Sequence, residues 1–143
     1  MMPRIILDTN VFISGIFWEG NYCSQIIAAW KAGRFTLVTS LEIVKELVDT
    51  LREFKIEMPA EIIEGWRTMI VENSTIVLPL QKLDLVKDDP KDNKFFEAAL
   101  AGEAQYLVSQ DKKQVLKIQE FRGIRTVTPE KFCTILAGWN EGK

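Results

Sequence analysis

The stretch "IILDTNVFISG", residues 5–15, places one carboxylate, Asp8, between two apolar runs. A short and almost wholly apolar run, such as residues 4–7, is typical of a strand that is buried on both faces. In an open parallel sheet, functional sites lie outside the carboxyl ends of the strands. We therefore expect Asp8 to stand at the edge of a sheet where a functional site would lie.

Short apolar or β-branched runs recur along the chain, at residues 4–7, 35–38, 75–78, 105–108 and 124–127. Longer segments with apolar residues at helical spacing lie between or after them, at residues 22–32, 40–54, 59–72, 92–101 and 129–138. This alternation predicts an α/β fold in which helices cover a central parallel sheet of about five strands. The longest expected loop is "PLQKLDLVKDDP", residues 79–90.

The length and composition of the chain are those of one ordinary globular domain. With 143 residues, 47% of them hydrophobic, and a net charge of -2, we expect a single domain over residues 1–143. The small net charge argues against a strongly basic nucleic-acid binder. No apolar run approaches the roughly 18 residues that a membrane span needs, so we expect a cytoplasmic protein without membrane contact.

The chain contains no histidine. This excludes Ser-His-Asp triads, HExxH zinc sites and ribonuclease chemistry that uses histidine as acid and base. Cys23 and Cys133 have no CxxC partner, so we expect reduced, buried thiols and no zinc site. Any catalysis must come from carboxylates, hydroxyls, lysines or metals that they hold.

Acidic residues from separate segments fall near the carboxyl ends of the predicted strands. Asp8 and Asp111 follow strands, Asp92 opens a helix, and Glu46 lies on the helix after the second strand. Two carboxylates about 4 Å apart repel each other by roughly 4 kcal/mol at an effective dielectric constant near 20, so such a cluster requires cations. Oxygen ligands without imidazole or thiolate suit Mg²⁺ or Mn²⁺, which activate water for phosphodiester hydrolysis.

A second interpretation of these acids is purely structural. Each of the three aspartates precedes a predicted helix, and aspartate is a preferred N-cap residue. Glu42 fits a capping box that starts at Thr39 in "TSLE". Glu46 lies one turn deeper on the same helix, where its alternative role is that of a solvated surface residue. Both interpretations stand open for each acid taken alone.

Four blocks of sequence resemble the PIN-domain nucleases, especially the branch that provides toxins of toxin–antitoxin pairs. In order along the chain, the blocks are "IILDTNVFISGIF", "LVTSLEIVKEL", "DPKDNKFFEAALAGEAQYLVSQD" and "IRTVTPEKF". The resemblance implies a three-layer α/β/α sandwich around a parallel sheet. It also implies a ribonuclease that depends on Mg²⁺ or Mn²⁺ and cuts RNA internally.

The resemblance also implies which residues form the site. The catalytic and metal-binding acids would be Asp8, Glu46 rather than Glu42, Asp92 and Asp111, with Asp89 in place of Asp92 if the latter only caps a helix. Asn10 and Ser109 match polar positions that support the site. The chain departs from many relatives at Gln110, where they have a small residue, often glycine, before the fourth acid.

Four lysines border the predicted acids and are candidates to hold RNA phosphates: Lys91, Lys94, Lys112 and Lys113. Solvation of the helix starts is the other interpretation of these lysines. Trp18 and Tyr22 offer rings on which bases could stack, whereas core packing better suits Phe17.

The resemblance implies a cognate antitoxin and a homodimer as partners. A stripe on the segment 59–72 is the candidate antitoxin contact face, with core burial as the alternative: Ile62, Ile63, Trp66, Met69 and Ile70. A catalytically silent module of the same fold, which binds RNA or the antitoxin, is the competing functional hypothesis, because a fold does not establish an activity.

Overall fold

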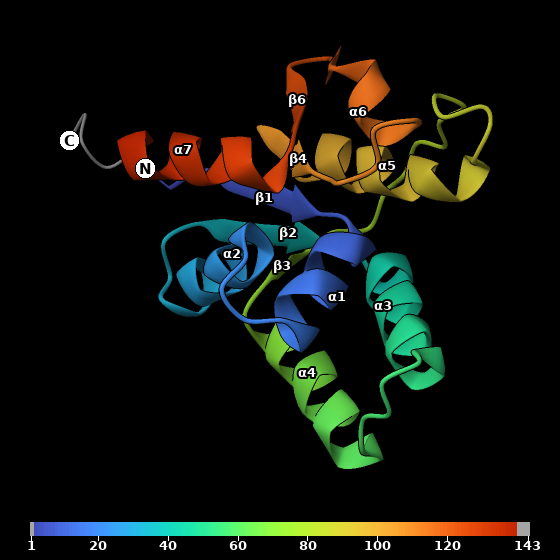
Figure 1. Cartoon of the computed structure of the whole chain (residues 1–143). Helices are drawn as coiled ribbons and strands as arrows, with labels where there is room; N and C mark the ends of the chain where they lie inside the picture. The colour runs from blue at the N-terminus through green and yellow to red at the C-terminus, as the bar shows by residue number, and fades with distance from the viewer. Residues whose placement is uncertain (1, 140–143) are drawn as a thin grey trace.

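Six strands form one sheet in the computed structural model, which describes residues 2–139 (Figure 1). In spatial order they are β3 (Thr75–Ile76), β2 (Thr36–Thr39), β1 (Arg4–Leu7), β4 (Tyr106–Val108), β6 (Ile124–Val127) and β5 (Glu120–Phe121). All neighbouring strands pair in parallel except β5 and β6, which are antiparallel. The predicted α/β fold with its mostly parallel sheet is confirmed.

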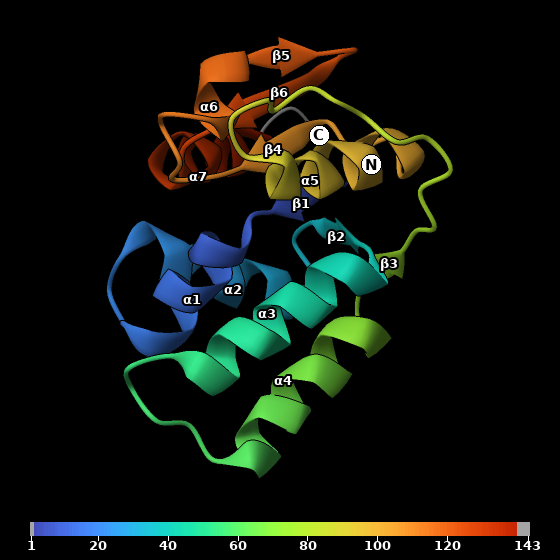
Figure 2. The same ribbon diagram turned by 90° about the vertical axis from the view of Figure 1, so that its right-hand side faces the viewer.

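Helices cover both faces of this sheet, as Figure 2 shows. The first face is covered mainly by α1 (Thr9–Phe17), α2 (Tyr22–Lys31) and α7 (Pro129–Trp139), and the second by α5 (Asn93–Ala101). The remaining helices are α3 (Leu41–Glu53), α4 (Ala60–Glu72) and the short α6 (Val115–Ile118). Within residues 2–139, no helix is both long enough and apolar enough to cross a membrane.

The central strand β1 is buried on both faces, as its apolar sequence predicts. Ile5 and Leu7 belong to the core cluster on the side of α1, α2 and α7, whereas Ile6 belongs to the cluster under α5. This alternation follows from the two-residue period of a strand. Because β1 pairs with β2 on one side and β4 on the other, the residue that follows it is held at the centre of the sheet edge.

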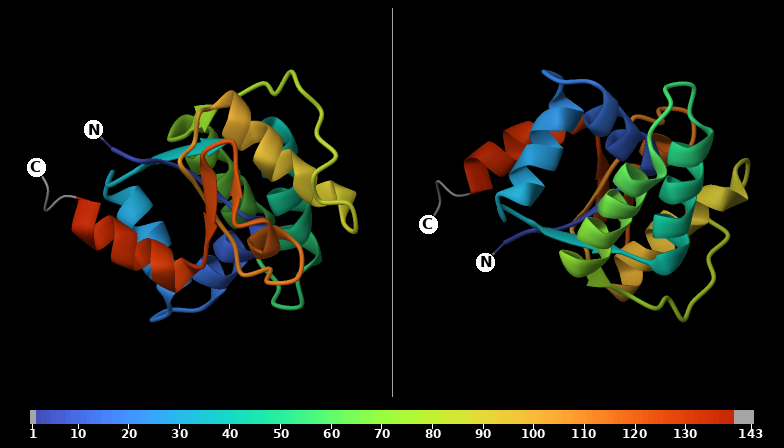
Figure 3. Two further views of the ribbon diagram at one scale, coloured as in Figure 1. Left: turned by 90° about the horizontal axis from the view of Figure 1, so that it is seen from above. Right: turned by 90° about the horizontal axis from the view of Figure 1, so that it is seen from below.

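The helices α3 and α4 lie side by side as a pair, which the view from below in Figure 3 shows clearly. Ile63 and Ile70 are buried, and Trp66 and Met69 pack against the core, so only Ile62 of the candidate antitoxin contact face is exposed. Core burial is therefore the correct interpretation for most of that stripe. Its apolar spacing reflects packing against the rest of the domain.

Two buried polar residues of α5 hold the long loop between β3 and α5. The Asn93 side-chain oxygen accepts hydrogen bonds from the backbone of Leu85 at 2.9 Å and Val86 at 2.7 Å. The Glu97 carboxylate accepts one from the backbone of Leu83 at 2.9 Å. These bonds satisfy loop N–H groups that no sheet or helix pairs, and they fix the chain just before a 3₁₀ turn, Pro90–Asp92.

The predicted parallel sheet of about five strands gains one short antiparallel edge strand, β5, which the sequence pattern did not indicate. Residues 120–121 form a hairpin with β6 through a two-residue turn at Arg122 and Gly123, where φ is +50° and +85°. Positive φ at both turn positions is the signature of a tight hairpin turn. A strand of two residues is too short to show a hydrophobic period.

The two cysteines are free thiols. Cys23 is buried and Cys133 is half-buried, and burial raises the pKa of both thiols. A rise in pKa disfavours the reactive thiolate. The expectation of a buried thiol holds for Cys23, whereas Cys133 is only partly buried.

Gly15 lies where α1 packs closely on α2, and Gly65, on α4, offers a helical glycine without such a contact as the comparison. A Cβ atom at Gly15 would lie 2.7 Å from both the Cys23 carbonyl oxygen and Ile27 Cγ1, whereas Gly65 has no neighbour within 4 Å. We expect Gly15→Ala to lower the free energy of unfolding by about 1–3 kcal/mol, because backbone and core atoms must shift. Gly65→Ala should raise it by about 0.5–1 kcal/mol through helix propensity. Urea unfolding of both variants measures this; equal effects would contradict the close packing.

Candidate active site

The four predicted acids line one cavity at the carboxyl edge of the sheet. This acid cavity has a volume of about 290 Å³, and Asp8, Glu46, Asp92 and Asp111 all contribute to its wall. They come from the end of β1, from α3, from the 3₁₀ turn before α5 and from the segment after β4. Residues as far apart as 8 and 111 in the sequence thus share one solvent-accessible space.

A single buried hydroxyl links Asp8 to Asp111. Ser109 Oγ donates a hydrogen bond to Asp8 Oδ2 at 2.7 Å and accepts one from the Asp111 backbone at 3.0 Å. Ser109 is fully buried, and Asp8 is only 5% exposed. The backbone N–H of Asp8 also continues the pairing of β1 with β4 by bonding to the Val108 carbonyl at 3.0 Å. Ser109 therefore sets the orientation of Asp8 and the path of the chain into Asp111.

Glu46 is held by a buried lysine. Lys94 Nζ donates to Glu46 Oε1 at 2.6 Å and to the Lys91 carbonyl oxygen at 2.6 Å, while Thr9 Oγ1 donates to Glu46 Oε2. The Lys94 side chain is only 6% exposed. The prediction that Lys94 holds RNA phosphates is therefore corrected: its ammonium group is the counter-ion of Glu46. Lys91, Lys112 and Lys113 remain exposed.

The start of α3 differs from the predicted capping box. Ser40, and not Thr39, is the N-cap, because its Oγ accepts a hydrogen bond from the Ile43 backbone at 3.3 Å. Thr39 is the last residue of β2. Glu42 is exposed and lies outside the acid cavity. Glu46 thus lines the cavity and Glu42 does not, although the predicted capping box that starts at Thr39 does not form.

The interpretation of the three aspartates as helix N-caps holds for only some of them. Neither Asp8 nor Asp92 makes a side-chain cap hydrogen bond to the helix that follows it. Asp111 Oδ1, in contrast, accepts hydrogen bonds from the backbone of Lys113 at 3.1 Å and Gln114 at 3.0 Å. The carboxyl group of Asp92 has no hydrogen bond or ion pair with any residue in the range 2–139, so it is open to the cavity.

The crowding of carboxyl groups changes their proton affinity. Burial raises the pKa of Asp92 to about 7, with the negative charges of Asp8, Asp89 and Asp111 adding to the effect and Lys94 opposing it. Burial also raises the pKa of Asp8, with smaller contributions from Glu46 and Asp111, while the Ser109 hydroxyl and the nearby N–H of Asn10 oppose the rise. The cavity therefore favours the uptake of positive charge, either protons or cations.

The donor set suits a hard cation, since oxygen atoms dominate the acid cavity and the chain has no histidine. Among residues 2–139, no three acidic or cysteine side chains are already grouped closely enough to hold one metal ion. Mg²⁺ commonly needs only one or two carboxylates and keeps several waters. The residues thus fit such an ion if carboxylates supply one or two of its ligands and water supplies the others.

Two residues of the cavity, Thr9 and Thr50, were not assigned a role from the sequence. Asp89, the predicted replacement for Asp92, also lines it, and Asn10, predicted to support the site, is an exposed part of its wall. The position of Thr9 next to Asp8 in the sequence could have identified Thr9 as a residue of the site. Its bond to Glu46 was not predictable, because the partner lies 37 residues away on α3.

Comparison with known proteins agrees with the geometry. The chain matches the model of the PIN domain family over residues 4–113. Its fold is similar to that of VapBC2 from Rickettsia felis bound to a promoter DNA fragment, with a TM-score of 0.59, 15% identity, and coverage of 87% of this chain and 98% of that one. It is also similar to FitAB bound to the IR36 DNA fragment, with a TM-score of 0.58, 12% identity, and coverage of 87% and 94%. No curated protein matches the chain significantly.

The raised pKa of Asp92 makes stability depend on pH. Between the ordinary pKa of 3.8 and the folded value of about 7, the folded protein binds a proton that the unfolded chain releases, so this residue destabilises the fold as pH rises. We expect the Tm of Asp92→Asn, relative to the native Tm, to increase from about pH 4 to about pH 7.5 in EDTA. Asp84→Asn removes an exposed carboxylate as the control. A constant difference between Asp92→Asn and the native protein would contradict the shift.

The ion pair between Lys94 and Glu46 gives a second prediction. Lys94→Met leaves the Glu46 carboxylate without its counter-ion, and we expect a loss of about 1–3 kcal/mol in the free energy of unfolding. This is less than the loss of about 3–5 kcal/mol for a fully buried pair, because the Glu46 side chain remains 30% exposed. Lys45→Met breaks the exposed pair with Asp49 and should change stability far less.

Adding Glu46→Gln to Lys94→Met removes the unpaired charge and should restore part of the loss. Thermal and urea unfolding of the three variants measure this coupling. A double variant that is no more stable than Lys94→Met would show that the charge of Glu46 is not what Lys94 compensates.

Proposed function

Because this chain belongs to the PIN-domain family, we propose that it is a metal-dependent endoribonuclease that hydrolyses RNA phosphodiester bonds. The observation that carries the proposal is the acid cavity, where carboxylates from four separate segments meet at the carboxyl edge of the sheet. Acids in such a place destabilise a fold unless cations accompany them. A site of this kind suits chemistry on phosphate esters better than a structural role.

Three aspartates are the residues best placed to hold Mg²⁺ or Mn²⁺: Asp8, Asp92 and Asp111. When bound, such an ion supplies Lewis-acid activation of the attacking water and stabilises the charge of the leaving oxygen. Glu46 must exchange one of its hydrogen-bond partners, Thr9 or Lys94, before it joins them. Its negative charge already acts on Asp8 and raises the pKa of that carboxyl group.

The other residues of the site position these acids and the substrate. Ser109 keeps Asp8 in one orientation through its 2.7 Å hydrogen bond, and Lys94 neutralises Glu46 inside the wall. Asp92, with a pKa of about 7, carries a proton on its carboxyl group in part of the molecules at neutral pH. The exposed ammonium groups of Lys91, Lys112 and Lys113 border the cavity or the loop beside it and suit contacts with RNA phosphates.

The biological setting that we propose is that of a toxin in a toxin–antitoxin pair. The four sequence blocks support it, and so does the shared fold with VapBC2 and FitAB, both of which are described bound to DNA fragments. A cognate antitoxin, a homodimeric state and a cytoplasmic location belong to this proposal.

A silent RNA-binding or antitoxin-binding module of the same fold is the second candidate. It is favoured by the pairing of Glu46 with Lys94, and by the lack of three ready-grouped metal ligands among residues 2–139. Divalent cations separate the two candidates, since the silent module has no need to bind them in the acid cavity.

The test combines metal binding with RNA cleavage. With Mn²⁺ at about 100 times its Kd, the native protein should gain about 2.7 kcal/mol of stability, seen as a rise in Tm. Asp8→Asn should lose that rise. Incubation of the native protein with total RNA and Mn²⁺, followed by mapping of new ends, should reveal cleavage that Asp8→Asn and Asp92→Asn abolish.

Glu42→Gln is the matched control, because it removes an exposed acid from the same helix as Glu46 but from outside the acid cavity. It should keep both the Mn²⁺ response and the cleavage. Cleavage that survives both aspartate substitutions would place the activity elsewhere, and no Mn²⁺ response in the native protein would favour the silent module.

A further inference from the structure

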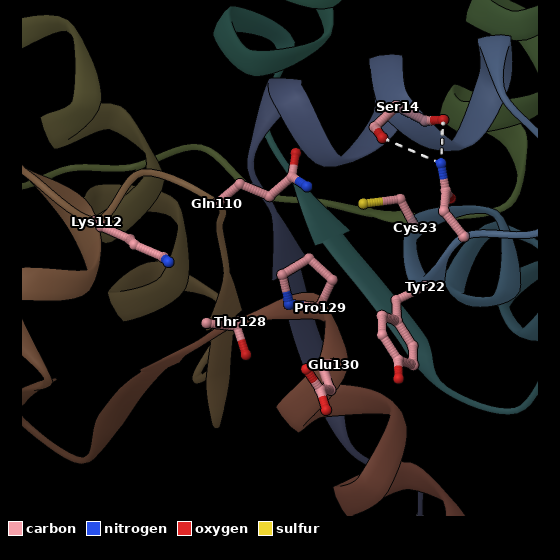
Figure 4. A pocket seen from close by; sticks show the side chains of 9 residues that line it. Ser14, Tyr22, Cys23, Gln110, Lys112, Thr128, Pro129 and Glu130 are labelled. Carbon is pink, nitrogen blue, oxygen red and sulfur yellow. Dashed lines mark hydrogen bonds between the residues drawn. The ribbon is translucent and has the colours of Figure 1, made fainter.

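A second cavity of about 380 Å³ lies next to the acid cavity, between α1, α2, the segment after β4 and the start of α7. We call it the Gln110 cavity. Figure 4 shows Gln110 and Lys112 entering it from one side and Cys23 and Tyr22 from the other, with Pro129 and Glu130 beside them. Its size lies in the range of about 300–1,000 Å³ that small-molecule sites occupy.

Two elements form walls of both cavities. Gln110 and Lys112 line the Gln110 cavity, whereas Asp111 between them lines the acid cavity. On α1, Asn10 lines the acid cavity and Ser14 lines the Gln110 cavity. Residues four apart lie on the same helix face, about 6 Å apart along the axis. A flexible ligand chain that places one of its chemical groups at the acids can therefore place the neighbouring group in the Gln110 cavity.

The free polar groups of the Gln110 cavity identify the kind of ligand. The side chains of Gln110 and Lys112 are exposed and bond to no residue within 2–139, so an amide donor, an amide acceptor and an ammonium group are available. Asn21, the other amide in the wall, is already engaged: its nitrogen donates to the Ser14 carbonyl at 3.3 Å and its oxygen accepts from the Ser24 backbone at 2.7 Å. Gln110 is thus the amide whose donor and acceptor are free to form hydrogen bonds with a ligand.

An unpaired nucleobase matches this set of groups. Tyr22 is 45% exposed, and aromatic rings of this kind stack on single-stranded bases regardless of sequence. An amide with both a donor and an acceptor pairs with the edge of a base. The Glu130 carboxylate disfavours a second phosphate in the cavity and can accept a hydrogen bond from a base amino group. Lys112 follows Asp111 in the chain, so it lies at the side of the cavity nearest the acids. The phosphate that joins the seated nucleotide to the rest of the RNA would pass there.

We propose that the Gln110 cavity seats the base next to the scissile phosphodiester, and that Gln110 selects which base is accepted. The inference rests on the proposed ribonuclease function and adds to it a source of cleavage-site preference. Gln110 is a specificity-determining residue here and takes no part in the chemistry at the acids.

Mapping of cleavage ends tests the role of Gln110 directly. The native protein with Mn²⁺ should show a base preference at one position beside the cut, and Gln110→Leu should weaken that preference by about 5- to 100-fold. Leucine keeps a similar volume but lacks the amide. Gln25→Leu, an exposed glutamine on α2 outside the cavity, is the matched control and should change nothing.

Binding without cleavage gives an independent measurement. Fluorescence anisotropy with the four homopolymeric oligoribonucleotides in EDTA should show one preferred base in the native protein and a reduced preference in Gln110→Leu. Tyr22→Ala should weaken binding of all four oligonucleotides. Lys112→Ala should weaken binding more than Lys113→Ala, because only Lys112 lines the cavity and the two lysines are neighbours of equal charge.

The outcomes separate this inference from the proposed function. Cleavage with the same base preference in the native protein and Gln110→Leu would overturn the inference and leave the ribonuclease function intact. Base-selective binding that depends on Gln110, without any Mn²⁺-dependent cleavage, would support the cavity as a base site and contradict the nuclease. RNA binding that is absent altogether would overturn both.

Discussion

Electrostatic repulsion among carboxyl groups at one edge of the sheet is the constraint on which the rest of the site depends. Asp8, Asp92 and Asp111 share the acid cavity, and burial, together with the negative charges of Asp8, Asp89 and Asp111, raises the pKa of Asp92 to about 7. The protein compensates this charge unevenly. Glu46 is neutralised internally by Lys94, and Asp8 is stabilised by the Ser109 hydroxyl, while Asp92 is left without a partner in residues 2–139. The unbalanced charge that remains is what makes the cavity receptive to a cation.

The fold keeps this unfavourable arrangement in place by strong packing on either side of it. The strand that ends at Asp8 is buried on both faces, and β4 beside it leads directly into Ser109. The turn that carries Asp92 is fixed by Asn93, whose side chain binds the incoming loop at 2.7 and 2.9 Å. The same segment that places Asp111 in the acid cavity places Gln110 and Lys112 in the neighbouring one. The proposed chemistry and the proposed base selection would thus be linked through a few adjacent backbone positions.

Sequence patterns predicted the parts of the molecule that depend on local period and on strand order. The buried strands, the helices of ten or more residues and the meeting of acids at one edge all follow from such patterns. The β5 hairpin was missed because two residues carry no period, and the helix cap was placed one residue early, at Thr39 instead of Ser40. Lys94 was assigned to RNA phosphates because it borders Asp92 in the sequence, whereas its partner Glu46 lies 48 residues away.

The sequence by itself determined the class of fold through its apolar spacing, and it indicated the family and the candidate acids through four blocks that resemble the PIN-domain nucleases. Only the tertiary structure decided which hydrogen bonds or counter-ions stabilise the carboxylate of each acid. The bonds from Lys94 to Glu46 and from Ser109 to Asp8 join residues 48 and 101 positions apart, and no local pattern records such partners. Burial, which sets the pKa of Asp8 and Asp92, is likewise a property of the packed chain and not of any short segment.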